Sequence, residues 1–253
     1  HTAAIKNDGT LWVWGYNNYG QLGDGTAVHK SSPIQIPGNT WNDIAYGQHH
    51  AAAIKNDGTL WACGYSGYGQ LGDGTTVSKS SPIQIPGTSW SKIACGDSHT
   101  AAIKNDGTLW VWGFNAQGQL GDGTNVNKSS PVQISGTSWN VIACGNTHTV
   151  AIKNDGTLWV WGDNAQGQLG DGTVIRKSSP IQIPGTSWSK ISCGMYHTVA
   201  IKNDGTLWAW GRNAFGQLGD GTAVHKSSPI QIPGVNWVDV SVGWYHAIAV
   251  KSQ

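Results

Sequence analysis

The stretch HTAAIKNDGTLWVWG, residues 1–15, recurs almost letter for letter at 50–64, 99–113, 148–162 and 197–211. The Asp-Gly pair of its turn returns every 49 residues, at Asp8, Asp57, Asp106, Asp155 and Asp204. A fixed period of this size without insertions is typical of a solenoid or a propeller. The sequence therefore predicts one body built from five repeats instead of two independent domains.

Within the third repeat, four short segments have the composition of β-strands. They cover residues 90–95, 99–104, 108–112 and 130–134. The turn at 105–107 is Asn-Asp-Gly, in which glycine supplies the positive φ of a tight hairpin. No segment has the i, i+3, i+4, i+7 apolar spacing of a helix. Four antiparallel strands per repeat predict the blades of a β-propeller.

The repeat boundaries define the expected domain organisation. We expect a single all-β domain over residues 1–253, a propeller of five four-stranded blades, with units 1–49, 50–98, 99–147, 148–196 and 197–245. Segment 246–253 is a partial sixth copy of the opening strand. A closed five-blade ring needs only five copies. We favour a ring whose last blade mixes both ends of the chain, with the spare strand frayed. The alternative is an open turn, or a head-to-tail assembly connected by that strand.

Charge and cysteine content narrow the function classes. Lys and Arg number 15 against 14 Asp and Glu, so the net charge of +1 gives no electrostatic case for nucleic acid or an anionic membrane. Four cysteines are too few for a disulfide framework in a chain of 253 residues. Cys63 stands where other repeats have tryptophan, and Cys95, Cys144 and Cys193 share one repeat position, so we interpret all four as packing residues. The compartment stays open, with a secreted or cell-surface location slightly favoured.

A longer motif extends through each repeat: Gly-x-x-His-Thr-x-Ala-Ile-Lys-x-Asp-Gly-x-Leu-Trp-x-Trp-Gly-x-Asn-x-x-Gly-Gln-Leu-Gly-Asp-Gly. It resembles the regulator of chromosome condensation repeat, and all five units have it. The resemblance implies four-stranded propeller blades, with a family norm of seven against the five expected here. Members of the family include a nucleotide exchange factor, a plant photoreceptor and a β-lactamase inhibitor. They share a loop-lined face that engages a protein, so the resemblance implies a fold more firmly than a function.

The repeated polar residues have two interpretations. A ring of the histidines His1, His50, His99, His148, His197 and His246 could bind a metal or an anion. We favour hydrogen bonding of each histidine to backbone groups of its own tight loop, because identity in every unit suits a scaffold. The aspartates of the Gly-Asp-Gly-Thr turns, Asp24, Asp73, Asp122, Asp171 and Asp220, offer one carboxylate each, whereas calcium takes six to eight oxygens. We interpret them as turn residues, and expect neither a metal nor a cofactor.

The candidate site lies where the repeats differ from one another. The link before each repeated histidine varies, and so does the start of the long loop after the tryptophan strand. Strand alternation places both on one face, and aromatic residues and arginine often anchor protein interfaces. The predicted binding face comprises Tyr16, Tyr19, His49, Tyr65, Tyr68, Asp97, Phe114, Gln117, Asp163, Gln166, Met195, Tyr196, Arg212, Phe215, Trp244 and Tyr245.

No nucleophile, base and orienting group can be assembled from residues that are special to one repeat, so we predict no catalytic site. The favoured function is a non-enzymatic recognition module that binds a protein partner. One alternative is a structural, self-assembling repeat protein, a monomer or a head-to-tail assembly through 246–253. Another is a lectin-like carbohydrate binder, since exposed aromatic residues beside Asn, Gln and Asp suit sugars. The sequence leaves open whether the chain is natural, designed or part of a longer repeat array.

Overall fold

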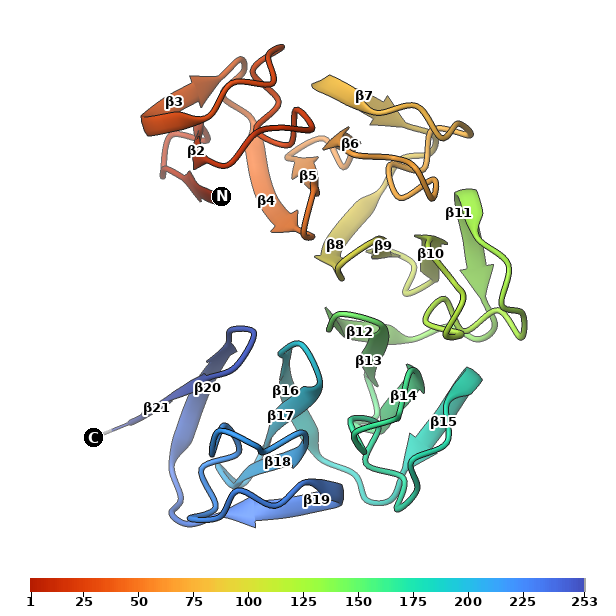
Figure 1. Cartoon of the computed structure of the whole chain (residues 1–253), viewed down its shortest axis with the longest axis vertical. Helices are drawn as coiled ribbons and strands as arrows, with labels where there is room; N and C mark the ends of the chain where they lie inside the picture. Colours follow the sequence, from red (N-terminus) through yellow and green to blue (C-terminus); the bar gives the residue numbers. More distant parts are fainter. Residues whose placement is uncertain (253) are drawn as a thin grey trace. The chain divides into compact units, whose positions relative to one another are not determined.

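The computed structural model describes residues 1–252, which form twenty-one β-strands and, within that range, no helix (Figure 1). The strands assemble into six antiparallel sheets, four of which have four strands each in simple up-and-down order. Repeated four-stranded antiparallel sheets of this kind are propeller blades. The predicted fold class, an all-β propeller with one blade per 49-residue repeat, is confirmed.

The contacts divide the chain into two compact units, which we describe separately. The first comprises His1–Phe114 and Val126–Ser135, and the second comprises Asn115–Asn125 and the chain from Gly136 onward. The single domain over 1–253 stays a prediction. The strands of the first unit are β1 (Thr2–Ile5), β2 (Leu11–Gly15), β3 (Lys30–Ile36), β4 (Trp41–Tyr46), β5 (His50–Lys55), β6 (Leu60–Gly64), β7 (Lys79–Ile85), β8 (Trp90–Cys95), β9 (His99–Lys104), β10 (Leu109–Gly113) and β11 (Lys128–Ile134). The strands of the second unit are β12 (Trp139–Cys144), β13 (His148–Lys153), β14 (Leu158–Gly162), β15 (Lys177–Ile183), β16 (Trp188–Cys193), β17 (His197–Lys202), β18 (Leu207–Gly211), β19 (Lys226–Ile232), β20 (Trp237–Val242) and β21 (Ala247–Lys251).

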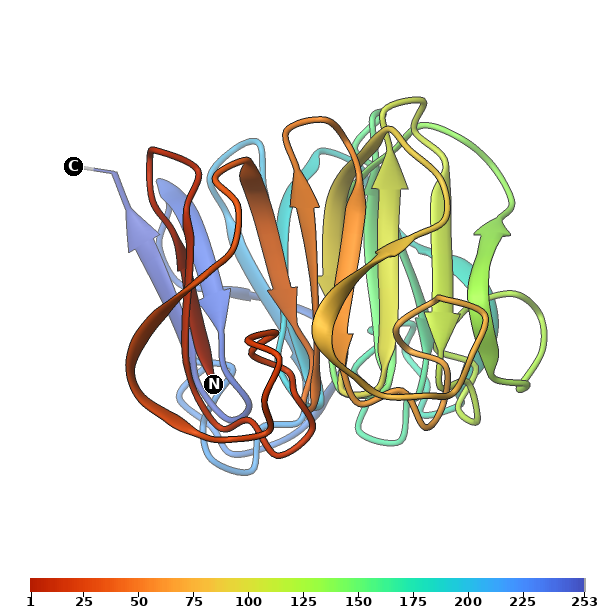
Figure 2. The ribbon, with the colours of Figure 1, turned by 90° about the horizontal axis from the view of Figure 1, so that it is seen from above.

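The Asn-Asp-Gly turns close the hairpins between the second and third strands of each blade (Figure 2). In the turn between β9 and β10, the Asp106 carboxylate accepts hydrogen bonds from the backbone N–H and the hydroxyl of Thr108, at 2.9 and 2.7 Å. These bonds hold the pKa of Asp106 below its usual range. The Thr108 hydroxyl in turn accepts the indole N–H of Trp110 at 2.9 Å. The turn aspartate is therefore structural, as predicted.

A lysine lies over two tryptophan rings at the same end of each complete blade. In the blade β8–β11 the ammonium of Lys104 is 4.7 Å from the ring centroid of Trp90 and 4.6 Å from that of Trp110. Lys55, Lys153 and Lys202 repeat the arrangement. The cation–π contact lets the lysine stem cover apolar surface while its charge stays near water. The sequence analysis identified the tryptophans as packing residues and missed the lysine.

The blade core contains a row of three cross-strand partners whose side chains share one face of the sheet. In β8–β9–β10 this row is Cys95, Thr100 and Trp112. Trp112 is fully buried, and its indole N–H donates to the carbonyl of Gln70 in the preceding blade at 3.0 Å. Its ring lies against Gly72, where a Cβ would come within 2.6 Å of Nε1 and where φ is +85°. Glycine at this position is therefore required by both the ring and the backbone.

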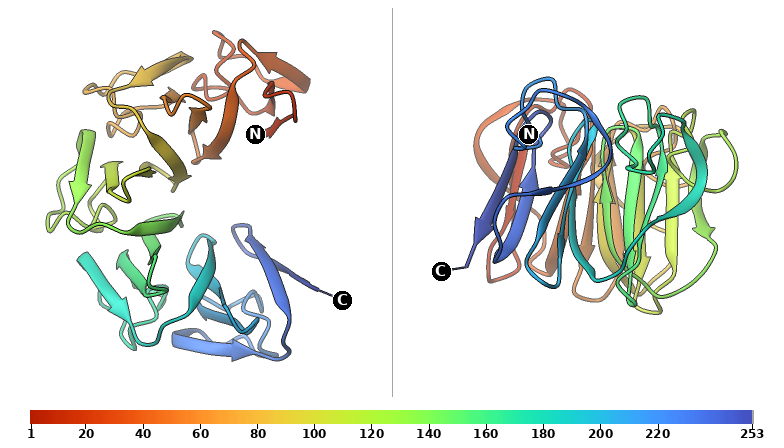
Figure 3. Two further views of the ribbon diagram at one scale, coloured as in Figure 1. Left: turned by 180° about the vertical axis from the view of Figure 1, so that it is seen from behind. Right: turned by 90° about the horizontal axis from the view of Figure 1, so that it is seen from below.

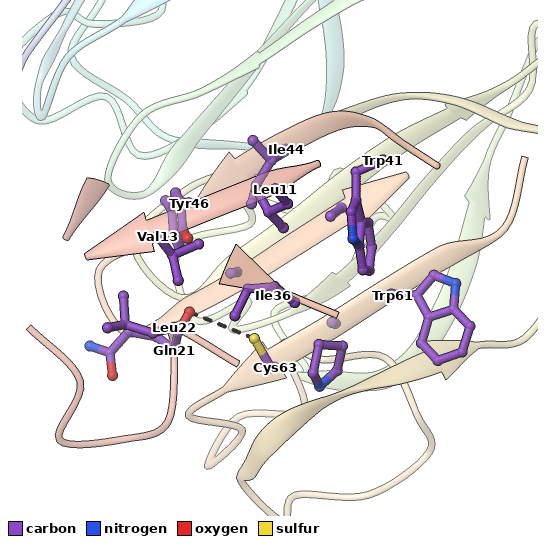
Figure 4. Close-up of a pocket in the computed structure, with 14 residues that line it drawn as sticks. Leu11, Val13, Gln21, Leu22, Ile36, Trp41, Ile44, Tyr46, Trp61 and Cys63 are labelled. Atoms are coloured by element: carbon purple, nitrogen blue, oxygen red, sulfur yellow. Dashed lines mark hydrogen bonds between the residues drawn. The ribbon is translucent and has the colours of Figure 1, made fainter. Parts of the chain in front are cut away.

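In the blade β4–β7 the large side chain of the same row is on a different strand. Tyr46, Ala51 and Cys63 are its cross-strand partners, so the large side chain stands on the first strand instead of the third. The thiol of Cys63 points to the carbonyl of Gln21, with the sulfur at 3.6 Å, where Trp112 donates an N–H to Gln70 (Figure 4). A cavity of about 20 Å³ remains beside Tyr46 and Cys63. All four cysteines are thiols, and Cys63 occupies a packing position, as predicted.

The sheets at the two ends of the sequence are shorter than the others. β1, β2 and β3 form a three-stranded sheet that lacks the first strand of a blade. β20 and β21 form a two-stranded sheet that lacks the third and fourth strands (Figure 3). The sixth copy of the opening strand is thus paired with β20 over Ala247–Lys251 and is not frayed there. The blade that mixes both ends of the chain stays a prediction.

Candidate binding face

The two variable loops of each repeat lie side by side. In Figure 2 the long loops of the first unit are at the lower ends of the strands, opposite the Asn-Asp-Gly turns. The first residue of the long loop donates its backbone N–H to a carbonyl of the link between the first two strands. The donor and acceptor residues are Tyr65 and His49 (2.8 Å), Phe114 and Ser98 (2.9 Å), Asp163 and Thr147 (2.8 Å), and Arg212 and Tyr196 (2.8 Å). Within each of the two compact units, the variable link and the variable long loop of a repeat therefore contribute to one surface, as strand alternation predicted.

A buried asparagine organises the inside of the long loop. Asn164 is fully buried, and its amide nitrogen donates to the Asp171 carboxylate at 2.9 Å and to the carbonyls of Thr173 and Ile175 at 3.1 and 3.2 Å. Its amide oxygen accepts the backbone N–H of Leu169 at 3.0 Å. A side chain with this many bonds fixes the path of the loop before any ligand arrives. Asn17 and Asn213 do the same in their repeats.

The Gly-Asp-Gly-Thr aspartates belong to this loop framework. Asp24 accepts the backbone N–H of Thr26 at 3.0 Å and forms an ion pair with Lys30 at 2.9 Å. Burial pushes the pKa of Asp24 upward, but the hydrogen bonds from Lys30 and Thr26 outweigh it and hold the pKa below its usual value. The interpretation of these aspartates as turn residues is confirmed. The next glycine, Gly25, donates to the carbonyl of Ser80 on β7 at 2.9 Å and so ties the loop to the neighbouring blade.

Seven aromatic rings form a continuous series of contacts across the loops of the first unit, which we call the aromatic ladder. Neighbouring centroids are 4.6–6.5 Å apart. The side chains of Tyr16, Tyr19 and Tyr68 are 38, 40 and 39 % exposed. The ladder consists of His29, Tyr16, Tyr19, His49, Tyr65, Tyr68 and Phe114.

A second aromatic cluster lies on the loops of the second unit. The guanidinium carbon of Arg212 is 5.4 Å from the ring centroid of Phe215, 5.7 Å from that of Tyr245 and 5.8 Å from that of Tyr196. Trp244 contacts Tyr245 edge-on and is 53 % exposed, and Phe215 is 68 % exposed. These five residues come from three different loops, which the sequence analysis placed on one face.

The other predicted residues have mainly local roles. Met195 accepts the Tyr245 hydroxyl at 3.1 Å, and Asp163 accepts the side-chain N–H of Gln168 at 2.8 Å. Gln166 donates its backbone N–H to Gln168. Asp97 is partly buried, which raises the pKa of its carboxyl group.

Two residues of the loop surface were missed from sequence. His29 stacks on Tyr16 at 4.9 Å, and the Arg176 guanidinium donates to the side-chain oxygen of Gln117 at 2.9 Å. Both occupy the position before the lysine of the Lys-Ser-Ser-Pro segment, which also differs between repeats and could have been included on that ground.

Two of the repeated histidines, His50 and His148, are buried and link neighbouring blades. The Thr100 hydroxyl donates to the carbonyl of Gln70 at 2.8 Å, so its oxygen accepts the Nε2–H of His50 at 2.9 Å. His148 bonds Thr198 in the same way at 3.1 Å. The expectation that each side chain bonds its own loop was wrong, because the partner is a hydroxyl of the next repeat. Burial, with a contribution from a neighbouring histidine, lowers the pKa of both His50 and His148 to about 3.

His197 shows what happens when that partner is missing. The residue that follows the next repeated histidine is Ala247, at the position of Thr100 and Thr198. Neither ring nitrogen of His197 has a hydrogen-bond partner within residues 1–252. Burial and then His246 lower its pKa to about 4. Across the described part of the chain, no cluster of three or more His, Cys, Asp or Glu side chains could hold a metal. Residues 1–252 also contain no helix that is long and apolar enough to cross a membrane.

Comparison with known proteins identifies the fold family. The family model of the RCC1-like domain matches residues 84–253, and that of the regulator of chromosome condensation (RCC1) repeat matches residues 8–54 and 57–103. The chain belongs to the RCC1 repeat family. Among curated proteins, the Arabidopsis thaliana ultraviolet-B receptor UVR8 is 44 % identical over 36 residues, which are 14 % of this chain and 8 % of the receptor.

Two solved structures have the same fold. Human WBSCR16 superposes with a TM-score of 0.88 at 26 % identity, over 99 % of this chain and 69 % of that protein. Saccharomyces cerevisiae Prp20p superposes with a TM-score of 0.85 at 22 % identity, over 99 % and 67 %. This RCC1-type chain therefore spans about two thirds of these solved proteins and a small part of the receptor.

Proposed function

We propose that this RCC1-type propeller is a non-enzymatic recognition module that binds a protein partner through its variable loops. The observation on which the proposal rests is the set of exposed aromatic side chains on those loops, with Phe215 at 68 %, Trp244 at 53 % and Tyr19 at 40 % exposure. Tryptophan, tyrosine and arginine dominate the binding energy of protein interfaces.

The loop framework supports the same function. Because Asn164 and its equivalents fix each loop internally, binding requires little ordering of the backbone. An aromatic side chain such as Tyr68 has few rotatable bonds, so its immobilisation also costs little entropy. A rigid scaffold with variable loops is a common basis for recognition.

The relatives favour a protein ligand. Prp20p has binding properties toward Gsp1p and histones, and it has also been solved with Kap60 bound. At 22 % identity Prp20p shares the fold, and its partners indicate the class of ligand, not the particular protein.

A peptide selection tests this function. The chain is offered a displayed library of random twelve-residue peptides, and the selected binders are measured against Tyr19→Ala, Tyr68→Ala and Trp244→Ala. We expect at least one of these variants to weaken binding about tenfold, as the loss of an interface anchor does. Thr88→Ala is the matched control, because Thr88 is exposed on a connector between blades. Binders that are insensitive to every loop variant would refute the function.

One observation favours self-assembly as a second candidate. On β21, Ile248 and Val250 are 62 and 53 % exposed, and this strand pairs with β20 alone in the described chain. The alternate β21 residues Ala247 and Ala249 line a cavity of about 400 Å³ together with Leu207, Ile232 and Val240. An apolar strand with an open edge can pair with another chain. Light scattering over a concentration series tests this: a mass that rises with concentration supports assembly, and a constant monomer mass overturns it.

A further inference from the structure

From Tyr19 to Phe114 the rings of the aromatic ladder are steeply inclined to one another, whereas His29 stacks on Tyr16 at an interplanar angle of 27°. The interplanar angle is 63° between Tyr19 and Tyr65, 81° between Tyr65 and Tyr68, and 52° between Tyr68 and Phe114. Between Tyr19 and Tyr68 the edge of one ring therefore meets the face of the next, so this part of the surface alternates between edges and faces. A sugar stacks on an open, flat ring face, which this arrangement offers poorly. Small non-planar apolar groups that fit between inclined rings suit it better.

The ladder also has unused hydrogen-bond donors. Within residues 1–252, the hydroxyl groups of Tyr19, Tyr65 and Tyr68 donate to no acceptor. The Tyr16 hydroxyl accepts the side-chain N–H of Asn18 at 3.0 Å, which leaves its own proton available. The natural complement is a ligand with a regular series of free acceptors, such as backbone carbonyl groups.

Two aspartates on the loops of the ladder are paired with lysines. Asp24 forms an ion pair with Lys30 at 2.9 Å, and Asp73 forms one with Lys79 at 3.9 Å. The ladder itself contains tyrosine, phenylalanine and histidine and no lysine, arginine or carboxylate. A phosphate backbone would need lysine or arginine at the contact. The electrostatics therefore favour an uncharged ligand.

We propose that the aromatic ladder binds a proline-rich segment in the polyproline II conformation. Such a segment has no internal hydrogen bonds, so every carbonyl is free to accept a proton, and its pyrrolidine rings pack on aromatic side chains. Its three-residue turn rises about 9 Å. Two successive ladder steps, 5.1 Å from Tyr19 to Tyr65 and 6.1 Å from Tyr65 to Tyr68, reach this length when the three rings lie in line. This inference rests on the proposed function and specifies its ligand for the first unit.

The direct test uses N-acetylated decaproline amide as the probe and a Gly-Ser peptide of equal length as the matched negative ligand, both measured by calorimetric titration. We expect decaproline to bind and the Gly-Ser peptide not to bind. Tyr19→Ala and Tyr68→Ala should each weaken decaproline binding about tenfold. Tyr19→Phe, which keeps the ring and removes the donor, should weaken it about threefold. Thr88→Ala, on the exposed connector between β7 and β8, is the control variant and should leave it unchanged.

Each other outcome overturns the inference in a recognisable way. Decaproline that fails to bind, or that binds Tyr19→Ala and Tyr68→Ala as well as the parent chain, removes the ladder as a proline site. If cellohexaose binds and Tyr68→Ala weakens that binding, while decaproline does not bind, the ligand of the ladder is a glycan and not a proline-rich peptide. Selected peptides that contain no proline, yet need Tyr19 or Tyr68, overturn this inference and leave the proposed function standing. Selected peptides that bind all loop variants as tightly as the parent chain overturn the proposed function itself.

Discussion

In the core row of blade β4–β7, a large Tyr46 and a small Cys63 lie on either side of Ala51. Exchanging the large and the small side chain between these two positions tests whether the size of one compensates for the size of the other. Tyr46 and Cys63 line the same cavity, whereas the third repeat has Cys95 and Trp112 at these positions (Figure 4). Tyr46→Cys alone removes a large side chain and should lower the free energy of unfolding by about 2–4 kcal/mol. Cys63→Trp alone adds an indole beside the retained tyrosine and should lower it by about 1–3 kcal/mol through overpacking.

The change in unfolding free energy of the double variant Tyr46→Cys/Cys63→Trp should differ from the sum of the changes in the two single variants. Its tryptophan can occupy the space of the tyrosine and donate its N–H to the Gln21 carbonyl, as Trp112 does to Gln70. We expect the double variant to be at least about 2 kcal/mol more stable than additivity of the single variants gives. Tyr46 is half-buried, and its buried hydroxyl has no hydrogen-bond partner in the described chain, so removal of this hydroxyl favours the double variant further.

The assay is urea denaturation followed by far-ultraviolet circular dichroism, because tryptophan fluorescence changes with the substitution itself. The m-value must agree among the variants for the midpoints to report stability. The reciprocal pair is the control: Trp112→Cys should cost about 3–5 kcal/mol, and Cys95→Tyr should recover part of that loss. Additivity within about 0.5 kcal/mol at both rows would refute compensation, as would a Cys63→Trp variant that is by itself more stable than the parent chain.

Three further substitutions or conditions have defined outcomes. Ala247→Thr should give His197 the hydroxyl that its counterparts have and raise the free energy of unfolding by about 1 kcal/mol in urea melts; no change would mean that the link between blades adds nothing. His50, His148 and His197 have pKa values of about 3, 3 and 4 in the fold, so only the unfolded chain binds their protons as the pH falls from about 6.5 to 4. The free energy of unfolding should therefore be constant above pH 6.5 and decrease below it, by up to about 4 kcal/mol per pH unit for the three histidines together. A urea midpoint that does not change between pH 7 and 5 would contradict the burial of these histidines as neutral rings. Asn164→Ala should cost about 2–4 kcal/mol and increase amide exchange in its loop, since it leaves buried groups unpaired; unchanged exchange would show that the loop is fixed by other contacts.

The fold was predictable because the signals repeat. An Asn-Asp-Gly turn between apolar strands predicts a hairpin once, and the recurrence of Asp106 in five units at a fixed spacing predicts a set of identical blades. The turn role of the aspartates also follows from local chemistry, because the partner of Asp106 is Thr108, two residues along the chain.

Contacts between repeats were harder to predict. The histidine partner lies 50 residues away, in Thr100 for His50, and a single sequence gives no sign of that pairing. The lysine that covers two tryptophans was missed for the same reason, since Trp90 and Trp110 meet at Lys104 only after the strands have paired. The loop surface was predicted in position but not in grouping: His29 joins Tyr16 because the long loop folds back on itself.

These distant contacts explain how the scaffold stays constant while the loops vary. Each buried link joins a residue to its neighbouring blade, as His148 joins Thr198, so a change in one row is felt by the adjacent row and little further. In the Tyr46 and Cys63 row the large and the small side chain have exchanged strands within the same sheet. The loop side chains, such as Tyr68, project from a framework fixed by different residues and can therefore change without disturbing these rows. Separation of the two sets of contacts is what allows one repeated blade to present different loop side chains in each repeat.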